Sequence, residues 1–202
     1  MKVALIGATG QAGSRLLAEL TQRGHAVTAI SRHPEKALKG PLITAKSGDV
    51  RDPGALVSLL AGHDAVISSV HFVDTDPASL IGAVRAAGVK RYLVVGGAGS
   101  LEVAPGVTLI STPQFPAAYK EEAGRGGQFL ETLKGVDDLD WTFLSPSALF
   151  VAGERTGKFR LGKDQLLANE KGSSISFEDF AIAMVDEIEK PAHVRERFTV
   201  GY

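Results

Sequence analysis

Cysteine is missing from all 202 residues. Its absence excludes disulfide bridges, thiolate catalysis and zinc sites built on cysteine, and it suits a protein of a reducing cytoplasm. Aromatic residues are also few, at 6% of the chain, and the formal net charge is only −1. This balance gives no electrostatic argument for binding nucleic acid or an anionic membrane surface. We therefore expect a small-molecule partner.

Long hydrophobic runs are absent as well. The apolar residues after Met1 are followed at once by glycines, so they do not form a signal peptide, and no run is long enough to span a membrane. We expect a cytoplasmic protein with one domain over residues 1–202, as a monomer or homodimer. The histidines lack the spacing of metal ligands, so we expect no metal, ordinary surface or loop positions for all five, and only His71 near a crevice; they are His25, His33, His63, His71 and His193.

Short apolar runs alternate with amphipathic stretches, a pattern typical of repeated β-α units. Strands are predicted at residues 2–6, 25–30, 42–45, 65–69, 91–95, 141–144 and 198–200. Helices are predicted at residues 12–23, 53–61, 77–87, 116–134 and 177–189. The sequence thus predicts an α/β fold with a doubly wound, mostly parallel sheet, the Rossmann fold, and a small C-terminal lobe. Residues 151–175 are expected to be irregular and to lie on the substrate side.

A glycine-rich turn, Gly7-Ala8-Thr9-Gly10-Gln11-Ala12-Gly13, joins the first strand to the first helix. Gly7 permits a tight turn, Gly10 allows close backbone approach, and Gly13 lets the helix pack on the sheet. The helix N-terminus presents free N–H groups to phosphates. We predict that this turn, including Thr9, Gln11 and Ala12, binds the pyrophosphate of a dinucleotide.

The end of the second strand bears on the choice between NAD(H) and NADP(H). Here the sequence is Ser31-Arg32-His33, without the acid that NAD(H) binders place there. Arg32 can bind a 2′-phosphate through its planar guanidinium and Ser31 can add a hydroxyl, so NADP(H) is favoured. Arg32 could instead be a solvated loop residue.

Further cofactor contacts are expected where the other strands end. Asp49 and Val50 would lie beside the adenine, although Asp49 could instead cap the next helix. The remaining residues expected to line the cofactor are Ser68, Ser69, Val70, Gly96, Gly97 and Ala98.

The tyrosine–lysine pair of carbonyl-reducing short-chain dehydrogenases is absent. Tyr119 is followed four residues later by Ala123 instead of lysine, and neither Tyr92 nor Tyr202 has such a partner. Ketone reduction needs a proton donor for the developing alkoxide. A flavin or linear tetrapyrrole spreads the incoming charge over its own conjugated system, so positioning suffices.

The chain resembles the atypical short-chain dehydrogenases assigned as NADH-flavin reductases, which are related to flavin/biliverdin-IXβ reductases and NmrA-like proteins. The segments that carry this resemblance are 6–10, 48–50, 94–101, 115–116, 140–147, 153–157 and 175–181. It implies that Gly97–Ser100, Pro146 and Ser147 surround the nicotinamide. Biliverdin-reducing relatives carry a serine where this chain has Ala98, which favours flavin over a tetrapyrrole.

The resemblance implies an NAD(P)H-dependent reductase that binds flavin as a substrate and not as a prosthetic group. The catalytic residue is not identified by the sequence, and the candidates are Ser100, Tyr119 and Ser147. The alternative is an NmrA-like dinucleotide-binding redox sensor without turnover. A nucleotide-sugar epimerase is a distant third, because that reaction also needs the missing tyrosine.

Overall fold

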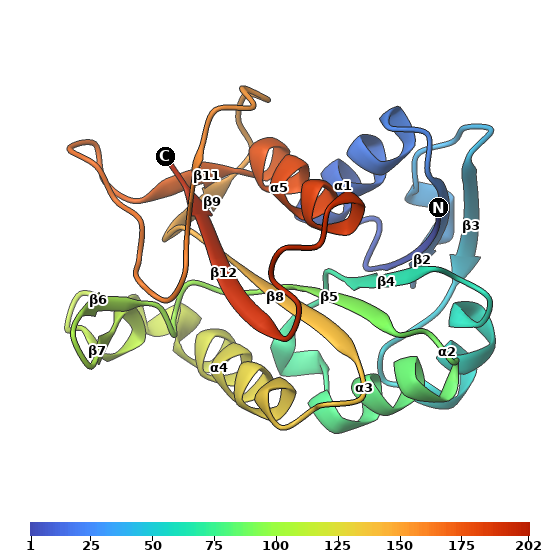
Figure 1. Cartoon of the computed structure of the whole chain (residues 1–202), viewed down its shortest axis with the longest axis horizontal. Helices are drawn as coiled ribbons and strands as arrows, with labels where there is room; N and C mark the ends of the chain where they lie inside the picture. The colour runs from blue at the N-terminus through green and yellow to red at the C-terminus, as the bar shows by residue number, and fades with distance from the viewer.

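The computed structural model describes the whole chain, residues 1–202. An eight-stranded sheet in the order β10-β12-β8-β5-β4-β1-β2-β3 forms its centre. Every neighbouring pair in this sheet is parallel except β10 with β12. Helices α1 and α5 cover one face, and α2, α3 and α4 cover the other (Figure 1). The predicted doubly wound fold is confirmed.

The strands of the central sheet are β1 (Lys2–Ile6), β2 (Ala26–Ser31), β3 (Ile43–Ser47), β4 (Ala65–Ser68), β5 (Arg91–Val95), β8 (Asp140–Pro146), β10 (Arg160–Gly162) and β12 (Glu196–Gly201). The α-helices are α1 (Gln11–Gln22), α2 (Pro53–Leu60), α3 (Pro77–Ala86), α4 (Lys120–Lys134) and α5 (Phe177–Glu189). None of these helices has the length and hydrophobicity needed to cross a membrane.

The central strands are apolar on both faces because each face packs against helices. In β5, Leu93 and Val95 belong to the core beneath α1 and α5, whereas Tyr92 and Val94 belong to the core beneath α2, α3 and α4. This two-sided burial explains the continuous hydrophobic runs in the sequence. The parallel direction of the strands places their carboxyl ends along one edge of the sheet, where ligands bind in such folds.

Four short strands lie outside the central sheet. Strands β6 (Glu102–Ala104) and β7 (Val107–Thr108) form an antiparallel pair, and β9 (Leu149–Val151) pairs in parallel with β11 (Ser174–Ser176). They were not predicted, because segments of two or three residues show no periodicity. Within residues 151–175, β10 is antiparallel to β12, and most of the remaining segment is irregular.

Residues 153–157, called the strap below, bind to the two helices on one face of the sheet. Arg155 donates from Nε and Nη2 to Glu19 of α1, at 2.8 and 2.9 Å. The N–H groups of Thr156 and Gly157 each donate to Oδ1 of Asp179 at 2.8 Å. Both acceptors are buried, with Glu19 3% and Asp179 0% exposed. The strap is therefore fixed to α1 and α5 by buried carboxylates.

The strap is expected to loosen in acid. Burial raises the pKa of Glu19, but hydrogen bonds from Arg155 and Arg23 outweigh it and bring that pKa below its ordinary 4.5. The contribution of Glu19 to stability is thus complete above pH 4.5 and is lost as the pH falls through the lower folded value. Hydrogen exchange of the strap amides, corrected for intrinsic rates, should rise in this range. Glu19→Gln should exchange faster than the wild type already at pH 7, although the Asp179 contacts are kept. Wild-type protection that persists unchanged in the variant would contradict this role.

The expectation that all histidines are ordinary surface or loop residues is wrong for His25, which is buried, whereas His193 does lie in the loop before β12. His25 is 6% exposed, and its Nε2 lies 2.9 Å from Glu189. His193 stacks on Phe198 with ring centroids 4.0 Å apart, and its Nδ1 lies 2.8 Å from Glu187. His25 and Glu189 are far apart in the sequence, so their pairing leaves no local pattern. No three histidine, aspartate or glutamate side chains gather as a metal site.

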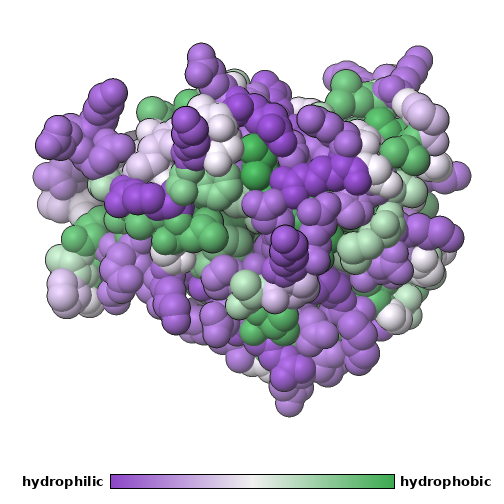
Figure 2. Space-filling view, turned by 45° about the horizontal axis from the view of Figure 1, so that its top comes forward, coloured by the Kyte–Doolittle hydropathy of each residue, from purple (hydrophilic) through white to green (hydrophobic).

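Hydrophobic residues also reach the surface. Figure 2 shows them as several patches interrupted by polar and charged side chains. Leu149 and Leu161, for example, are 55% and 52% exposed. The oligomeric state, a monomer or a homodimer, remains a prediction.

Candidate functional site

The turn between β1 and α1 is held by its own backbone and by β2. The N–H groups of Gly7 and Ala8 donate to the carbonyl of Ile30 at 2.9 and 3.3 Å. Gly7 has φ +82°, and a Cβ there would lie 1.9 Å from the carbonyl oxygen of Ser69. A Cβ at Gly13 would lie 2.0 Å from the carbonyl oxygen of Gly7. Packing alone therefore requires glycine at positions 7 and 13.

Gly10 differs, because a Cβ there would meet only the carbonyl oxygen of Gly7, at 3.3 Å. Gly10 is also exposed and is the N-cap of α1, with no side-chain cap and no acid in the first turn. By contrast, α2, α3 and α5 are capped by the side chains of Asp52, Asp76 and Ser176. The start of α1 is thus the open side of the turn.

Four backbone amides at this point have no acceptor within the protein: those of Thr9, Gln11, Ala12 and Gly13. Unpaired N–H groups at a helix N-terminus carry a partial positive charge. An anionic diphosphate would satisfy both the hydrogen bonds and the charge. Thr9 and Ala12 are half-buried and Gln11 is exposed, whereas Gly13 is buried, so three of the four amides belong to residues that reach the surface.

The end of β2 lies beside this turn. Ser31 is 6% exposed, and its hydroxyl is buried without a hydrogen-bond partner. Next to it Arg32 is exposed. A buried hydroxyl usually has a partner. The free group at Ser31 therefore fits a ligand at this position.

Asp49 follows β3 and binds Arg51, a residue that the sequence reasoning missed. Arg51 donates from Nη2 to Oδ2 of Asp49 at 2.5 Å and from Nε to Oδ1 at 3.0 Å. The hydrogen bonds from Arg51, with a smaller Coulombic contribution from Arg32, lower the pKa of Asp49 to about 2. The alternative role of Asp49 as a helix cap is wrong, since Asp52 caps α2 by accepting from Ala55 at 3.1 Å. Val50 is half-buried against the core.

The residues after β4 pack against the turn between β1 and α1. Ser69 N–H donates to Ile6 at 2.9 Å, and Val70 lies 3.2 Å from the Cβ position of Gly7. The hydroxyl of Ser68 is 2.9 Å from that of Tyr92, in the core. Ser69 and Val70 thus shape the turn, whereas the side chain of Ser68 is used internally.

The glycines after β5 have different surroundings. A Cβ at Gly96 would lie 2.2 Å from the Phe143 ring, and one at Gly99 would lie 2.7 Å from the Cβ of Ala123. A Cβ at Gly97 would meet nothing within 4 Å. Gly96 and Gly99 are therefore packing glycines, and the open position is Gly97, with half-buried Ala98 beside it.

The hydroxyls of two catalytic candidates are engaged within the protein. The oxygen of Ser100 accepts from Nη1 of Arg197 at 3.0 Å. Ser147 follows buried Pro146, is itself 0% exposed, and donates to the carbonyl of Val200 at 3.1 Å. Tyr119 is 65% exposed, and no hydrogen bond holds its hydroxyl. Burial raises the pKa of Tyr92, so that phenol stays protonated. These hydroxyls therefore form no acid–base pair of the short-chain dehydrogenase kind.

The residues present fit a dinucleotide. Residues 9–13 would hold its diphosphate, Ser31 and Arg32 would face its adenosine ribose, and Gly97 leaves space beside the end of β5. A nicotinamide ring, when bound, supplies a hydride. The residues of this chain would bind the dinucleotide and orient it.

Comparisons with known proteins agree with this geometry. A family model described as NAD(P)H-binding matches residues 7–191. The uncharacterised protein YwnB of Bacillus subtilis is 41% identical over 211 residues, covering 99% of this chain and 98% of that protein. An NAD(P)H azoreductase of Xenophilus azovorans is 25% identical, covering 98% of this chain and 67% of that protein.

Solved structures of other proteins are also similar to this chain over its full length. A Burkholderia pseudomallei structure described as an exported protein has 47% identity, TM-score 0.89 and full coverage of both chains. A proposed epimerase from Bacteroides thetaiotaomicron has 42% identity and TM-score 0.95, covering 100% of this chain and 96% of that one. A proposed NADH-flavin reductase from Streptococcus pneumoniae has 37% identity and TM-score 0.83, covering 100% and 99%. The similarity to each of them spans the whole fold.

Proposed function

Because the chain belongs to the NAD(P)H-binding family, we propose that it is a reductase that transfers hydride from NADPH to a flavin or a similar conjugated acceptor. The observation that carries this proposal is the group of four unpaired amides at Thr9 and Gln11–Gly13, in a chain without a tyrosine–lysine pair. The unpaired amides support a diphosphate site, and the chain lacks the usual means of protonating an alkoxide.

Two relatives support a conjugated acceptor. One is described as an NADH-flavin reductase and the other as an azoreductase. Flavins, quinones and azo compounds accept hydride at an electron-poor centre and delocalise the charge. Such a reaction depends on holding donor and acceptor face to face, and less on a protein acid. The epimerase assignment of the Bacteroides protein is less compatible with this chain, because epimerisation needs the missing tyrosine.

Turnover is the direct test. Purified protein with NADPH should oxidise the cofactor, followed at 340 nm, when FMN, FAD, riboflavin, a quinone, an azo dye or biliverdin is supplied. We expect the flavins to react best, as substrates that leave the protein on gel filtration. If no acceptor gives a rate above the enzyme-free blank, the reductase assignment fails.

The preference for NADP(H) rests on Ser31 and Arg32. Arg32→Ala should weaken NADP⁺ binding roughly 10- to 100-fold, as expected for a lost charge-assisted hydrogen bond of about 1.5–3 kcal/mol. NAD⁺ has no phosphate at this position, so its affinity should hardly change. Calorimetric titration of both nucleotides checks this, and an equal loss for both would refute the role of Arg32.

A redox sensor without turnover is the second candidate. It is favoured by the burial of Ser147, whose hydroxyl donates to Val200, and by the exposed Tyr119, whose hydroxyl has no partner that could activate it. Tight dinucleotide binding with no acceptor reduction, and co-purification with a regulatory protein, would support it. A cytoplasmic location remains part of the proposal and rests on the absence of cysteine.

A further inference from the structure

An acidic residue lies beside Arg32, although it comes from a different strand. The N–H of Gly48 donates to the carbonyl of Ser31 at 3.1 Å, which draws the end of β3 against the end of β2. Arg32 and Asp49 are the residues that directly follow Ser31 and Gly48, and Arg32 contributes to the lowered pKa of Asp49. A carboxylate therefore faces the region that we assign to the adenosine ribose.

Arg51 holds this carboxylate in a two-pronged pair. Its own N–H donates to Oδ1 of Asp49 at 2.9 Å, in addition to the contacts from Nε and Nη2. The side chain of Arg51 is 60% exposed, yet the three contacts fix its position. Asp74 adds a weaker Coulombic attraction to the same guanidinium. Asp49 thus fixes the position of the Arg51 side chain, and the guanidinium neutralises the charge of the carboxylate.

The charge of Asp49 matters for the two cofactors in opposite ways. A free carboxylate repels a 2′-phosphate but accepts a hydrogen bond from a 2′-hydroxyl. With Arg51 in place, its charge and both of its oxygens are engaged. Without Arg51, the positive charge of Arg32 would stand against the negative charges of Asp49 and Asp74.

We propose that Arg51 is a positioning residue for cofactor choice, which favours NADP(H) by neutralising Asp49. The inference rests on the proposed NADP(H) preference and goes beyond it, since Arg51 acts through Asp49 and not by contacting the phosphate. Arg32 remains the residue that meets the phosphate. The selectivity of this site thus depends on the pair Asp49–Arg51 as well as on Arg32.

The test is the ratio of the dissociation constants for NAD⁺ and NADP⁺, measured calorimetrically in the full-length protein. Arg51→Ala should weaken NADP⁺ roughly tenfold and leave NAD⁺ unchanged or tighter. In an Asp49→Asn background the same substitution should have little effect, because the charge it neutralises is gone. The matched control is Arg85→Ala, which breaks the exposed pair of Arg85 with Asp138, at 2.5 and 2.7 Å, on another part of the fold. It should change neither constant.

The outcomes separate the two proposals. If the wild type binds neither nucleotide, or prefers NAD⁺, the proposed cofactor preference fails and the inference falls with it. If the wild type prefers NADP⁺ and Arg51→Ala leaves the ratio unchanged, only the inference is overturned. The inference is also overturned if the double variant Asp49→Asn, Arg51→Ala binds NADP⁺ as weakly as Arg51→Ala alone. Arg51 would then act directly on the phosphate. Thermal melting of each variant verifies that the exposed substitutions leave the fold intact.

Discussion

Gly7→Ala is expected to abolish dinucleotide binding and to destabilise the protein by at least about 3 kcal/mol. The methyl group would lie 1.9 Å from the Ser69 carbonyl oxygen, at a position whose φ is +82°. Both the close contact and the left-handed backbone oppose a side chain. The turn must open to accommodate it, and the unpaired amides of α1 then move away from one another. Thermal melting and titration with NADP⁺ measure the two effects.

Gly82→Ala is the matched control for this prediction. Gly82 lies within α3, and a Cβ there meets nothing within 4 Å. Alanine favours a helix interior by up to about 1 kcal/mol over glycine, so this variant should be as stable as the wild type or more stable. It should bind NADP⁺ normally. Wild-type affinity in Gly7→Ala would show that the turn does not bind the diphosphate.

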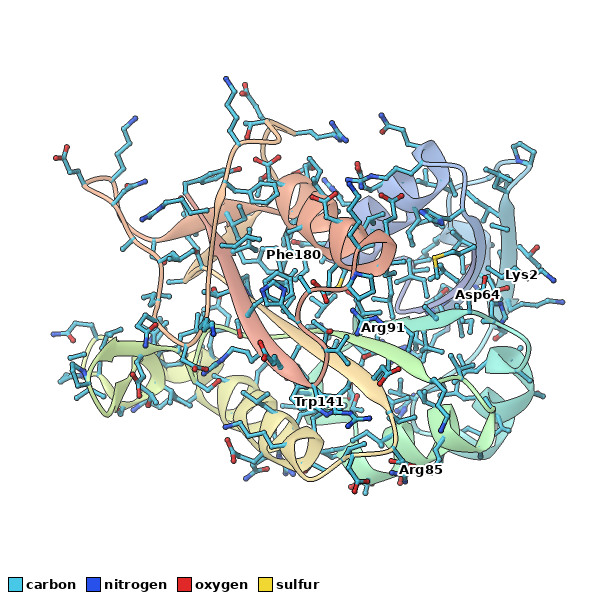
Figure 3. The ribbon with its side chains drawn as sticks, in the orientation of Figure 1. Lys2, Asp64, Arg85, Arg91, Trp141 and Phe180 are labelled. Atoms are coloured by element: carbon cyan, nitrogen blue, oxygen red, sulfur yellow. The ribbon has the colours of Figure 1, made fainter.

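Glu187→Ala should cause a second large loss, of about 3–5 kcal/mol, by leaving Arg91 without its buried partner. Glu187 is 3% exposed and accepts from Nη2 of Arg91 at 2.9 Å. Arg91 lies beside the last turn of α5, with 11% of its side chain exposed (Figure 3). Burial lowers the pKa of Arg91, and Glu187 offsets this in part. Glu187 also accepts from the N–H groups of Ala192 and His193, so the loop before β12 would lose its anchor.

Differential scanning calorimetry measures this loss. At about 2–4 °C per kcal/mol for a chain of this size, the midpoint should fall by roughly 6–20 °C. Glu131→Ala is the control, because Glu131 pairs with Lys134 on the exposed side of α4. Such a surface pair contributes about 0–1 kcal/mol. Equal melting of the two variants would show that the buried pair contributes no more than an exposed one.

The fold could be predicted from sequence because its main signals are local. Glycine positions 7, 10 and 13 follow a buried strand and precede an amphipathic helix, and each step of that pattern is visible within a dozen residues. The repeated β-α units add the parallel sheet. Strand β10 could not be found in this way, since three residues become a strand only by pairing with β12, which lies far along the chain.

Side-chain roles were harder to predict than the backbone. The sequence shows that Ser147 follows a strand, but not that its hydroxyl is already bonded to Val200. It shows Asp49 near the expected adenine, but not the pair with Arg51. Gly96 and Gly97 are neighbouring glycines, yet only Gly97 has open space at its Cβ position. Such distinctions depend on neighbours brought together by the fold.

The position of β10 also constrains the order in which the molecule assembles. β10 precedes β12 along the chain but joins the central sheet only through it. β12 in turn pairs with β8, far from it in sequence, and distant pairings of this kind form slowly. We therefore expect the β10 edge to dock late, after the interior strands have paired. A fluorescent probe at exposed Leu161 of β10 should report a refolding phase that lags behind burial of Trp141 on β8.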